Sequence, residues 1–417
     1  MTRTSRLSLC AAIVVALALV SLPDAGLGQA PSSDWPQWRG PNRDGVSRET
    51  GLLKRWPEGG PRLAWKATGA RDGYSSMAVT GGRLYTMGAK GDTEYVLAFD
   101  AATGRQIWEA ANGRRFGNDR GDGPRSTPTV EGGRVYVLGA SGDFSSFDAA
   151  SGKKIWSMNV LARFGGQNPH WGLSESPLVV NDRVLVNAGG RGASVIAVNK
   201  NDGTLIWKSQ DDQAAYSSAV VAEVGGIRHA VFFTNTRVIG VAVDDGRLLW
   251  SYGQVSNRTA NISTPVVRAN RVFVSSDYGT GGALLQLAAQ GKSVTATEIW
   301  FSRQMRTHHN TALWVADHLY AFSGTTLTAM QVDTGEVAWR DRSVGKGSLA
   351  YADERLYLFS EDGVVGLAEA NPSAYREHGR FRLPSGRLPT WSHPVVAGGR
   401  LYLRDQDHLY AYDVKQQ

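Results

Sequence analysis

The chain has 417 residues, of which 42% are hydrophobic and 20% are charged, a balance that supplies a packed core and excludes an intrinsically disordered chain. The formal net charge of +7 is spread through the sequence without a run of Lys and Arg. Because nucleic-acid-binding proteins gather their basic residues into a patch, we expect no nucleic-acid partner.

The N-terminus has the pattern of a secretory signal. Arg3 and Arg6 precede an apolar run over residues 9–22, which is followed by the small residues of 25–30. This order predicts a signal peptide over residues 1–30 and an exported protein, periplasmic or secreted after cleavage. The apolar run is shorter than the span of about 20 residues that a transmembrane helix needs, so we expect no transmembrane segment. The single cysteine, Cys10, lies inside the leader, so the mature chain would form no disulfide.

Residues 31–61 are rich in Pro, Gly and Arg and contain Trp35, Trp38 and Trp56. A free linker would not carry three indoles. The composition predicts an irregular N-terminal arm whose aromatic side chains pack onto the body of the protein. A ligand-stacking role for these indoles is the alternative.

From residue 62 to residue 417 a short unit recurs. Thr, Ser or Asp is followed by Gly, three further residues and Trp, as in Thr103-Gly104 with Trp108 and Ser151-Gly152 with Trp156. The Trp residues of the series are 39 to 51 positions apart: Trp65, Trp108, Trp156, Trp207, Trp250, Trp300 and Trp339. Repeats of this length, with short Val- and Tyr-rich runs between turn residues, are typical of β-propeller blades.

The strands within each repeat can be counted. First strands are expected at 75–80, 126–130, 174–180, 217–224, 263–267, 310–316, 347–352 and 392–397. The seventh repeat has Phe381 in place of Trp. Residues 62–68 resemble the last strand of a repeat, and residues 400–414 resemble a repeat that lacks this strand. The sequence therefore predicts an all-β fold, an eight-bladed propeller of four-stranded antiparallel blades whose ring is closed by the N-terminal strand.

The recurring turn has a local chemistry. Asp100, Asp148 and Asn199 stand eight residues before a Trp and can accept backbone N–H bonds within the turn. The Gly allows a positive φ angle. We expect each Trp to lie flat against the neighbouring blade and to hold the sheets together.

The D-x-x-[TS]-G-x-x-x-W unit resembles the tryptophan-docking motif of the PQQ-type propeller repeats, over about residues 62–417. The arm sequence DWPQWRGPNRDGVS resembles the start of many exported bacterial proteins with these repeats. The family includes two branches. Quinoprotein dehydrogenases bind PQQ and calcium, whereas BamB-like propellers are binding platforms without a cofactor.

Ligands and partners of propellers usually meet the loops that lead into the inner strands, at one mouth of the central channel. These loops are rich in His and aromatic residues. The candidate binding residues are Tyr74, Arg125, His170, Trp171, Glu175, Tyr216, Asn261, His308, His309, Trp391 and His393, and the same loops hold Asn310 and Lys346. Each of them alone could equally cap a strand or line a solvated channel. Adjacent side chains such as His308 and His309 point to opposite faces of a strand and would not chelate one ion unless they lie in a loop. His170 or His393 would have to complete such a site and no carboxylate is placed for it, so no metal site is expected.

These observations favour a non-catalytic scaffold that binds a protein or glycan partner at the channel mouth, in a monomer without a cofactor. The alternative is a PQQ- and calcium-dependent quinoprotein oxidoreductase, with Glu175 and Asn261 as calcium ligands and Trp171 as the floor under the quinone. The resemblance weakens this alternative, because such dehydrogenases typically carry a disulfide of adjacent cysteines and long insertions between blades. The sequence also contains no C-x-x-C-H haem motif.

Overall fold

The computed structural model describes residues 33–384 and 388–416 together with Met1. The predicted signal peptide, residues 1–30, otherwise lies outside the described residues. The chain divides into two units, Met1–Ser32 and Ser33–Gln417, and only the second is described below.

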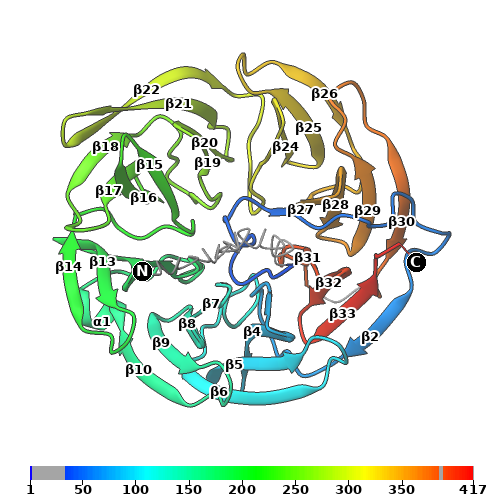
Figure 1. Cartoon of the computed structure of the whole chain (residues 1–417), viewed down its shortest axis with the longest axis horizontal. Coiled ribbons are helices and arrows are strands. Elements are labelled where there is room, and N and C mark those ends of the chain that lie inside the picture. The colour runs from blue at the N-terminus through cyan, green and yellow to red at the C-terminus, as the bar shows by residue number, and fades with distance from the viewer. Residues whose placement is uncertain (2–32, 385–387, 417) are drawn as a thin grey trace. The chain divides into compact units, whose positions relative to one another are not determined.

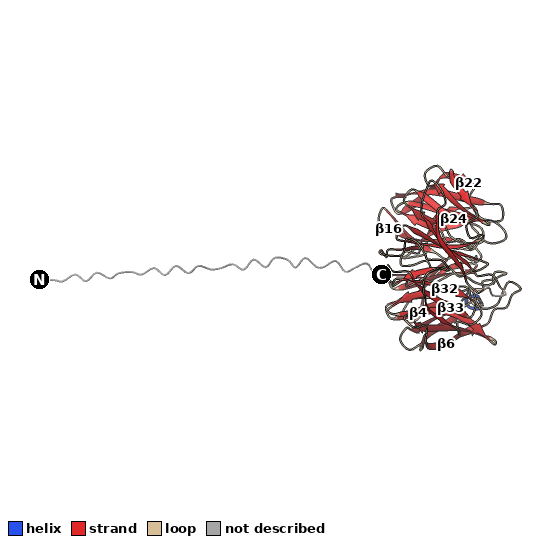
Figure 2. Cartoon of the chain, turned by 90° about the vertical axis from the view of Figure 1, so that its right-hand side faces the viewer, coloured by secondary structure: helices blue, strands red, loops and turns tan. Residues whose placement is uncertain are grey.

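This second unit is a ring of eight sheets (Figure 1), each with four antiparallel strands, which confirms the predicted eight-bladed propeller. One sheet gains a fifth strand, which pairs in parallel. Figure 2 shows that it consists of strands and loops almost throughout. The short helix α1 (Val160–Phe164) lies between blades 2 and 3, begins after the N-cap Asn159 and ends at Gly165.

The first four blades follow one another along the chain, each from the inner to the outer strand. Blade 1 consists of β3 (Ala78–Thr80), β4 (Arg83–Lys90), β5 (Thr93–Asp100) and β6 (Gln106–Arg114). Blade 2 consists of β7 (Thr129–Glu131), β8 (Arg134–Leu138), β9 (Asp143–Asp148) and β10 (Lys154–Asn159). Blade 3 consists of β11 (Leu178–Val180), β12 (Arg183–Gly190), β13 (Ala193–Asn199) and β14 (Leu205–Ser209). Blade 4 consists of β15 (Val220–Val224), β16 (Ile227–Phe233), β17 (Val238–Ala242) and β18 (Leu248–Tyr252).

The remaining blades include the two that N-terminal strands join. Blade 5 consists of β19 (Val266–Arg268), β20 (Arg271–Ser276), β21 (Gly281–Gln290) and β22 (Ser293–Ser302). Blade 6 consists of β23 (Leu313–Val315), β24 (His318–Ser323), β25 (Thr326–Gln331) and β26 (Val337–Asp341). Blade 7 consists of β27 (Gly347–Ala352), β28 (Arg355–Ser360), β29 (Val364–Glu369) and β30 (Glu377–Arg382), joined by β1 (Val46–Ser47). Blade 8 consists of β31 (Val395–Ala397), β32 (Arg400–Asp405), β33 (His408–Asp413) and β2 (Leu63–Ala67).

The ring closes as the sequence predicts. Strand β2 pairs antiparallel with β33, with Trp65 opposite Ala411 and Lys66 opposite Tyr410. The first and last parts of the propeller thus share one sheet, and the outer position of blade 8 is filled by the N-terminal strand.

Most inner strands are shorter than predicted. In blade 1 the ladder begins at Ala78, whereas the sequence pattern placed the start at Ser75. The small polar residues before the ladder bond to the neighbouring blade instead: Ser76 Oγ donates to His393 O over 3.0 Å, and Thr127 N donates to Ser176 Oγ over 2.9 Å. These bonds join successive blades around the channel.

Indole rings link most pairs of neighbouring blades. The indole N–H of Trp65 donates to Ala101 O on the next blade over 3.1 Å. The ring lies over the turn glycine, since a Cβ on Gly104 would come within 2.6 Å of Trp65. The same two contacts recur for Trp108 with Gly152, Trp156 with Gly203, Trp207 with Gly246 and Trp300 with Gly335. Trp339 donates to Asn371 O over 2.8 Å.

Trp250 departs from the expected docking. Its indole lies over Gly240 of its own blade and donates to His229 Nε2 over 3.1 Å. The next blade offers a different surface, because β21 and β22 form a hairpin of ten-residue strands that extends beside β18 (Figure 1). Leu287 and Val294 of this hairpin join the apolar cluster around Trp250. The hairpin thus replaces the glycine turn as the contact between blades 4 and 5.

The first part of the N-terminal arm enters the channel, and the second part runs outward along blades 7 and 8 (Figure 1), where Leu53 N donates to Val414 O over 2.7 Å and Trp56 N donates to His378 O over 2.9 Å. Trp35 exchanges backbone bonds with Val79 of blade 1, and Val130 N of blade 2 donates to Pro36 O over 2.8 Å. Further on, β1 pairs in parallel with β27 of blade 7, with Val46 opposite Tyr351.

Two buried arginines hold the arm in the channel. Arg43 Nη1 donates to Ser176 O over 3.0 Å and to Ala219 O over 2.9 Å, on blades 3 and 4. Arg39 donates to Thr311 O over 3.1 Å and to Ala312 O over 2.8 Å, on blade 6. These arginines therefore bond to the segments just before the inner strands on both sides of the channel.

Candidate binding site

A cavity of about 510 Å³ opens at the channel mouth, and every inter-blade loop contributes to its lining. Seven of the predicted binding residues line it: Tyr74, Arg125, Trp171, Tyr216, His308, His309 and Trp391. So does Lys346, from the loop between β26 and β27. The lining residues that sequence reasoning missed are Trp38, Arg120, Ser174, Ser218, Thr259, Ile262, Thr264 and Tyr278.

Aromatic rings dominate the wall, and they come from distant parts of the chain. Tyr74 and Trp391 pack with 4.7 Å between ring centroids, and Trp171 and Tyr216 with 5.7 Å. Trp38 of the arm adds a further indole, fixed by a 2.9 Å hydrogen bond from its Nε1 to Thr264 Oγ1. This indole is presented to the cavity because the arm occupies the channel.

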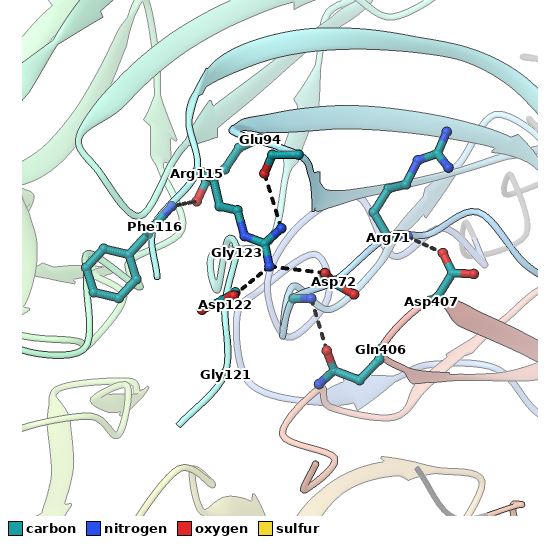
Figure 3. A network of polar contacts seen from close by, with 12 residues as sticks. Arg71, Asp72, Glu94, Arg115, Phe116, Gly121, Asp122, Gly123, Gln406 and Asp407 are labelled. Atoms are coloured by element: carbon teal, nitrogen blue, oxygen red, sulfur yellow. Dashed lines mark hydrogen bonds and ion pairs between the residues drawn. The ribbon is translucent and has the colours of Figure 1, made fainter. Parts of the chain in front are cut away.

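The loop before β7, residues 115–125, is held by a polar network (Figure 3). Arg115 Nη2 forms ion pairs with Asp122 over 2.5 Å and with Asp72 over 3.3 Å. Glu94, which is fully buried, accepts from Phe116 N over 3.4 Å and from Ala140 N over 3.1 Å. Burial raises the pKa of Glu94 to about 7. The loop that carries two of the cavity's cationic side chains is thus anchored at its start and near its end.

The same network fixes the loop that carries Tyr74 (Figure 3). Arg71 N donates to Asp407 Oδ1 over 2.7 Å, and Gly73 N donates to Gln406 Oε1 over 3.1 Å. Both acceptors lie in the β32–β33 turn of blade 8. The closure of the ring therefore also positions one wall of the cavity.

Arg125 is held in one orientation. Its guanidinium donates to Gly121 O over 2.7 Å and to Gly123 O. It also packs over the rings of Phe116, 4.9 Å from the centroid, and Tyr74, 5.6 Å from the centroid. Guanidinium groups stack on aromatic faces while their edges stay available for hydrogen bonds.

The adjacent histidines lie in the loop before β23, and both face the cavity. Their Nδ1 atoms are 3.4 Å apart, and Tyr278 Oη lies 3.0 Å from His308 Nε2. Burial lowers the pKa of His308 to about 4 and holds the pKa of His309 well below its ordinary value, and the Lys346 ammonium adds to both shifts. Both imidazoles are therefore neutral at physiological pH.

Behind the histidines, Glu361 joins the polar groups of this wall. Its Oε1 lies 2.9 Å from Lys346 Nζ and accepts from Trp391 Nε1 over 2.6 Å. His309 Nδ1 lies 3.6 Å from the same oxygen. Within the described part of the chain, no three His, Cys, Asp or Glu side chains are arranged to hold a metal ion.

Four predicted binding residues do not line the cavity. Asn261 folds its own loop, donating from Nδ2 to Thr234 O and Asn235 O, both over 3.0 Å. His393 packs against Trp38 with 4.5 Å between ring centroids. His170 is exposed and packs edge-on against Trp171.

The fourth of these residues, Glu175, is buried near Arg43 of the N-terminal arm. It accepts from Asn187 N over 2.6 Å, and the charge of Arg43 acts on it. Burial raises the pKa of Glu175 to about 8. It is a scaffold residue rather than part of the cavity wall.

The residues present do not fit the PQQ–calcium alternative. Calcium needs several oxygen ligands that converge, usually with carboxylates among them. The two ligands that this alternative requires, Glu175 and Asn261, are bonded to backbone groups outside the cavity. The charged side chains among the described lining residues, Arg120, Arg125 and Lys346, are all cationic. A lining of this kind repels a divalent cation.

The fold and the cavity define a class of protein, an eight-bladed propeller with docking tryptophans and a site of ligand size at one mouth. The sequence model of the family described as outer membrane protein assembly factor BamB matches residues 92–341, and the chain belongs to this family of PQQ-type repeats. The predicted resemblance is thereby confirmed. No curated protein matches the sequence significantly.

Solved structures from both branches share the fold. BamB from Moraxella catarrhalis superposes with a TM-score of 0.62 at 14% identity, covering 85% of this chain and 99% of that one. A europium-containing methanol dehydrogenase superposes with a TM-score of 0.64 at 12% sequence identity, covering 89% of each chain. A quinohemoprotein alcohol dehydrogenase from Pseudomonas putida HK5 superposes with a TM-score of 0.61 at 12% sequence identity, covering 92% of this chain and 81% of that one. Identities this low show the fold alone. No helix in the described residues is long and apolar enough to cross a membrane.

Proposed function

We propose that this protein is an exported, non-catalytic binding platform that holds a protein or glycan partner at the channel mouth, as a monomer. The observation that carries the proposal is the cavity itself. Loops from all eight blades, together with Trp38 of the arm, form one aromatic wall around about 510 Å³. Concave sites of this size with a few convergent polar groups are typical of ligand-binding sites.

The polar groups of the wall support binding better than catalysis. Arg125 is engaged with backbone carbonyls, and Glu361 with Trp391 and Lys346. General acid–base catalysis at neutral pH works best with a group whose pKa lies near 7. The cavity histidines are shifted away from that range, to about 4 for His308. Family membership is compatible with both roles, so the proposal depends on the site.

Tryptophan fluorescence tests the proposal, because Trp38, Trp171 and Trp391 line the cavity. The full chain, produced by export, is titrated with a panel of oligosaccharides and peptides and with candidate partner proteins. A ligand of the cavity should shift the emission, and Trp171→Ala combined with Trp391→Ala should abolish its binding. Trp314→Ala, on β23 outside the cavity lining, is the matched control and should bind as the parent does.

Two outcomes would contradict the proposal. Binding that is unchanged in the Trp171→Ala, Trp391→Ala variant would place the partner elsewhere. Stoichiometric uptake of PQQ with calcium, together with oxidation of an alcohol or aldose, would make the protein an enzyme. N-terminal sequencing of the exported product tests the signal peptide, since cleavage is expected close to residue 30.

A further inference from the structure

The cavity combines three kinds of surface. Aromatic faces come from several blades, hydroxyl groups come from Ser174, Ser218, Thr259 and Thr264, and the charged side chains of the described lining are all cationic. Ile262 is the aliphatic side chain among these lining residues. Such a wall suits a ligand that has a flat face, many hydroxyl groups and negative charge.

The cationic character depends chiefly on Arg125. Lys346 is largely neutralised by Glu361, 2.9 Å away, and Arg120 is exposed near Asp119. Asp122, the nearest acidic residue along the chain, is paired with Arg115 over 2.5 Å. None of the ion pairs among the described residues includes Arg125, although the charges of Glu94 and Asp122 act on it from further away. Its guanidinium donates to the carbonyls of Gly121 and Gly123, so its other N–H donors are available to a ligand.

The orientation of Arg125 is fixed before any ligand arrives. Two backbone carbonyls and two aromatic faces hold the guanidinium, and the 115–125 loop is itself anchored by Glu94 and Asp72. A guanidinium has five N–H donors, and the two bonds to carbonyls leave others free. Arginine pairs with carboxylates through two parallel bonds, and a side chain already ordered loses little entropy on binding.

We infer that the cavity binds an acidic oligosaccharide, a sugar chain that bears carboxylate groups, with one carboxylate on Arg125 and sugar rings against the Tyr74–Trp391 and Trp171–Tyr216 pairs. This inference rests on the proposed function and names the ligand class of the same site. Sugar rings present C–H faces to aromatic side chains and hydroxyl groups to Ser and Thr. The carboxylate distinguishes this class from neutral glycans.

Saturation-transfer NMR and calorimetry on the full exported chain test the inference, with tetragalacturonate and tetramannuronate as the probes. The methyl ester of each tetrasaccharide is the matched ligand control, because it keeps the sugar rings and removes the charge. We expect the esters to bind about tenfold more weakly or worse, as loss of a charged hydrogen-bonded pair implies. Affinity for the acids should also fall as salt is raised.

Substitutions of Arg125 test whether this residue supplies the positive charge that binds the carboxylate. Arg125→Gln should weaken binding of an acid by about tenfold and weaken binding of its ester much less. Arg125→Lys should retain part of the preference for the acid. Arg105→Gln is the matched control: Arg105 is exposed in the β5–β6 turn, at the other end of the strands from the cavity loops, and its removal should change nothing. Thermal unfolding checks that each variant folds.

The other outcomes separate the inference from the proposed function. Equal binding of acid and ester would overturn the acidic ligand and leave a glycan platform. Binding of a peptide through its C-terminal carboxylate, without binding of either sugar, would overturn the inference and leave a protein platform. If neither tetrasaccharide binds at millimolar concentration, the inference is wrong, whatever the fluorescence panel finds.

Discussion

The indole of Trp56, from the N-terminal arm, packs against the ring of Tyr357 on β28 with 6.0 Å between centroids. Docking tryptophans pack at the same ring-centroid distance against a tyrosine on the second strand of their own blade. The distance is 6.0 Å for Trp65 with Tyr402 and 6.1 Å for Trp339 with Tyr320.

The prediction that Phe381 replaces the docking Trp of blade 7 is wrong: Gly379, opposite Leu367, holds the register position that Trp339 holds opposite Ala329 in blade 6. A Cβ on Gly379 would come within 2.6 Å of Trp56, so the arm indole fills the space left by the missing side chain. The arm thus supplies the indole that the seventh repeat lacks.

Replacing Trp56 should therefore destabilise the whole ring. Trp56 is 4% exposed and packs against Tyr357 and Phe381. We expect Trp56→Ala to lower the free energy of unfolding by about 3–5 kcal/mol, the usual cost of removing a buried aromatic side chain. Chemical denaturation measures this. Trp314→Ala, at a partly exposed indole, should cost much less, and equal losses would show that Trp56 has no docking role.

The glycine turns allow a matched comparison of two positive-φ positions in one blade. Gly104 has φ +73° and lies under Trp65, whereas Gly82 has φ +74° and nothing within 4 Å of a built Cβ. Gly82→Ala should cost about 1–2 kcal/mol, from the backbone alone. Gly104→Ala should cost about 1–3 kcal/mol more, because the methyl group displaces the indole. Similar melting temperatures for the two variants would argue against the indole contact.

Arg43 should be essential for keeping the arm in the channel. It is 3% exposed and donates to carbonyls on blades 3 and 4. Arg43→Ala leaves these acceptors and the nearby Glu175 without their partner, so we expect the free energy of unfolding to fall by about 3–5 kcal/mol. Limited proteolysis should then cleave within residues 33–61. Arg48→Ala, at an exposed position of the same arm, is the control and should leave the arm protected.

Glu94 should make the protein less stable at neutral pH than at pH 4.5. Burial raises the pKa of Glu94 from 4.5 to about 7, so the folded state binds more protons than the unfolded state between these values. The free energy of unfolding therefore falls as the pH rises from 4.5 to 7, and the loss is complete above pH 7. Glu94→Gln removes the titration and keeps one acceptor oxygen, for either Ala140 N or Phe116 N. Relative to the parent, it should gain about 1–3 kcal/mol between pH 5 and pH 8.

Urea unfolding at several pH values measures the effect of Glu94. Glu58→Gln, at an exposed position, should follow the parent profile throughout. Parallel pH profiles for Glu94→Gln and the parent would mean that Glu94 is already ionised at pH 5.

Much of the fold could be predicted because each repeat encodes its own structure. The Asx turn, the glycine and the tryptophan lie within about a dozen residues, and the structure shows Asp100 Oδ1 accepting from Thr103 N over 2.8 Å and Asp148 Oδ1 accepting from Ser151 N over 2.8 Å. Where a tryptophan departs from the repeated docking contact, a neighbouring blade is the cause. Trp250 turns to His229 because the following blade presents a long hairpin, a feature of another repeat.

The lining of the cavity was predicted in part. The sequence indicated which loops meet at the mouth, and these supply Tyr74, Trp171 and Trp391. It could not separate residues that face the cavity from residues that shape a loop, such as Asn261. Both kinds of residue are polar or aromatic, and both lie in the loops between blades. The direction of a loop side chain depends on partners in other blades.

By itself, the sequence determined the eight blades and the closing of the ring, because strand alternation, turn glycines and docking indoles are local patterns repeated along the chain. Only the tertiary structure decided where the N-terminal arm goes. The carbonyls that receive Arg39 and Arg43 belong to the segments just before the inner strands of blades far apart in the sequence, and they converge only when the ring is complete. The cavity with Trp38 in its wall is therefore a property of the closed ring, since no single repeat contains it.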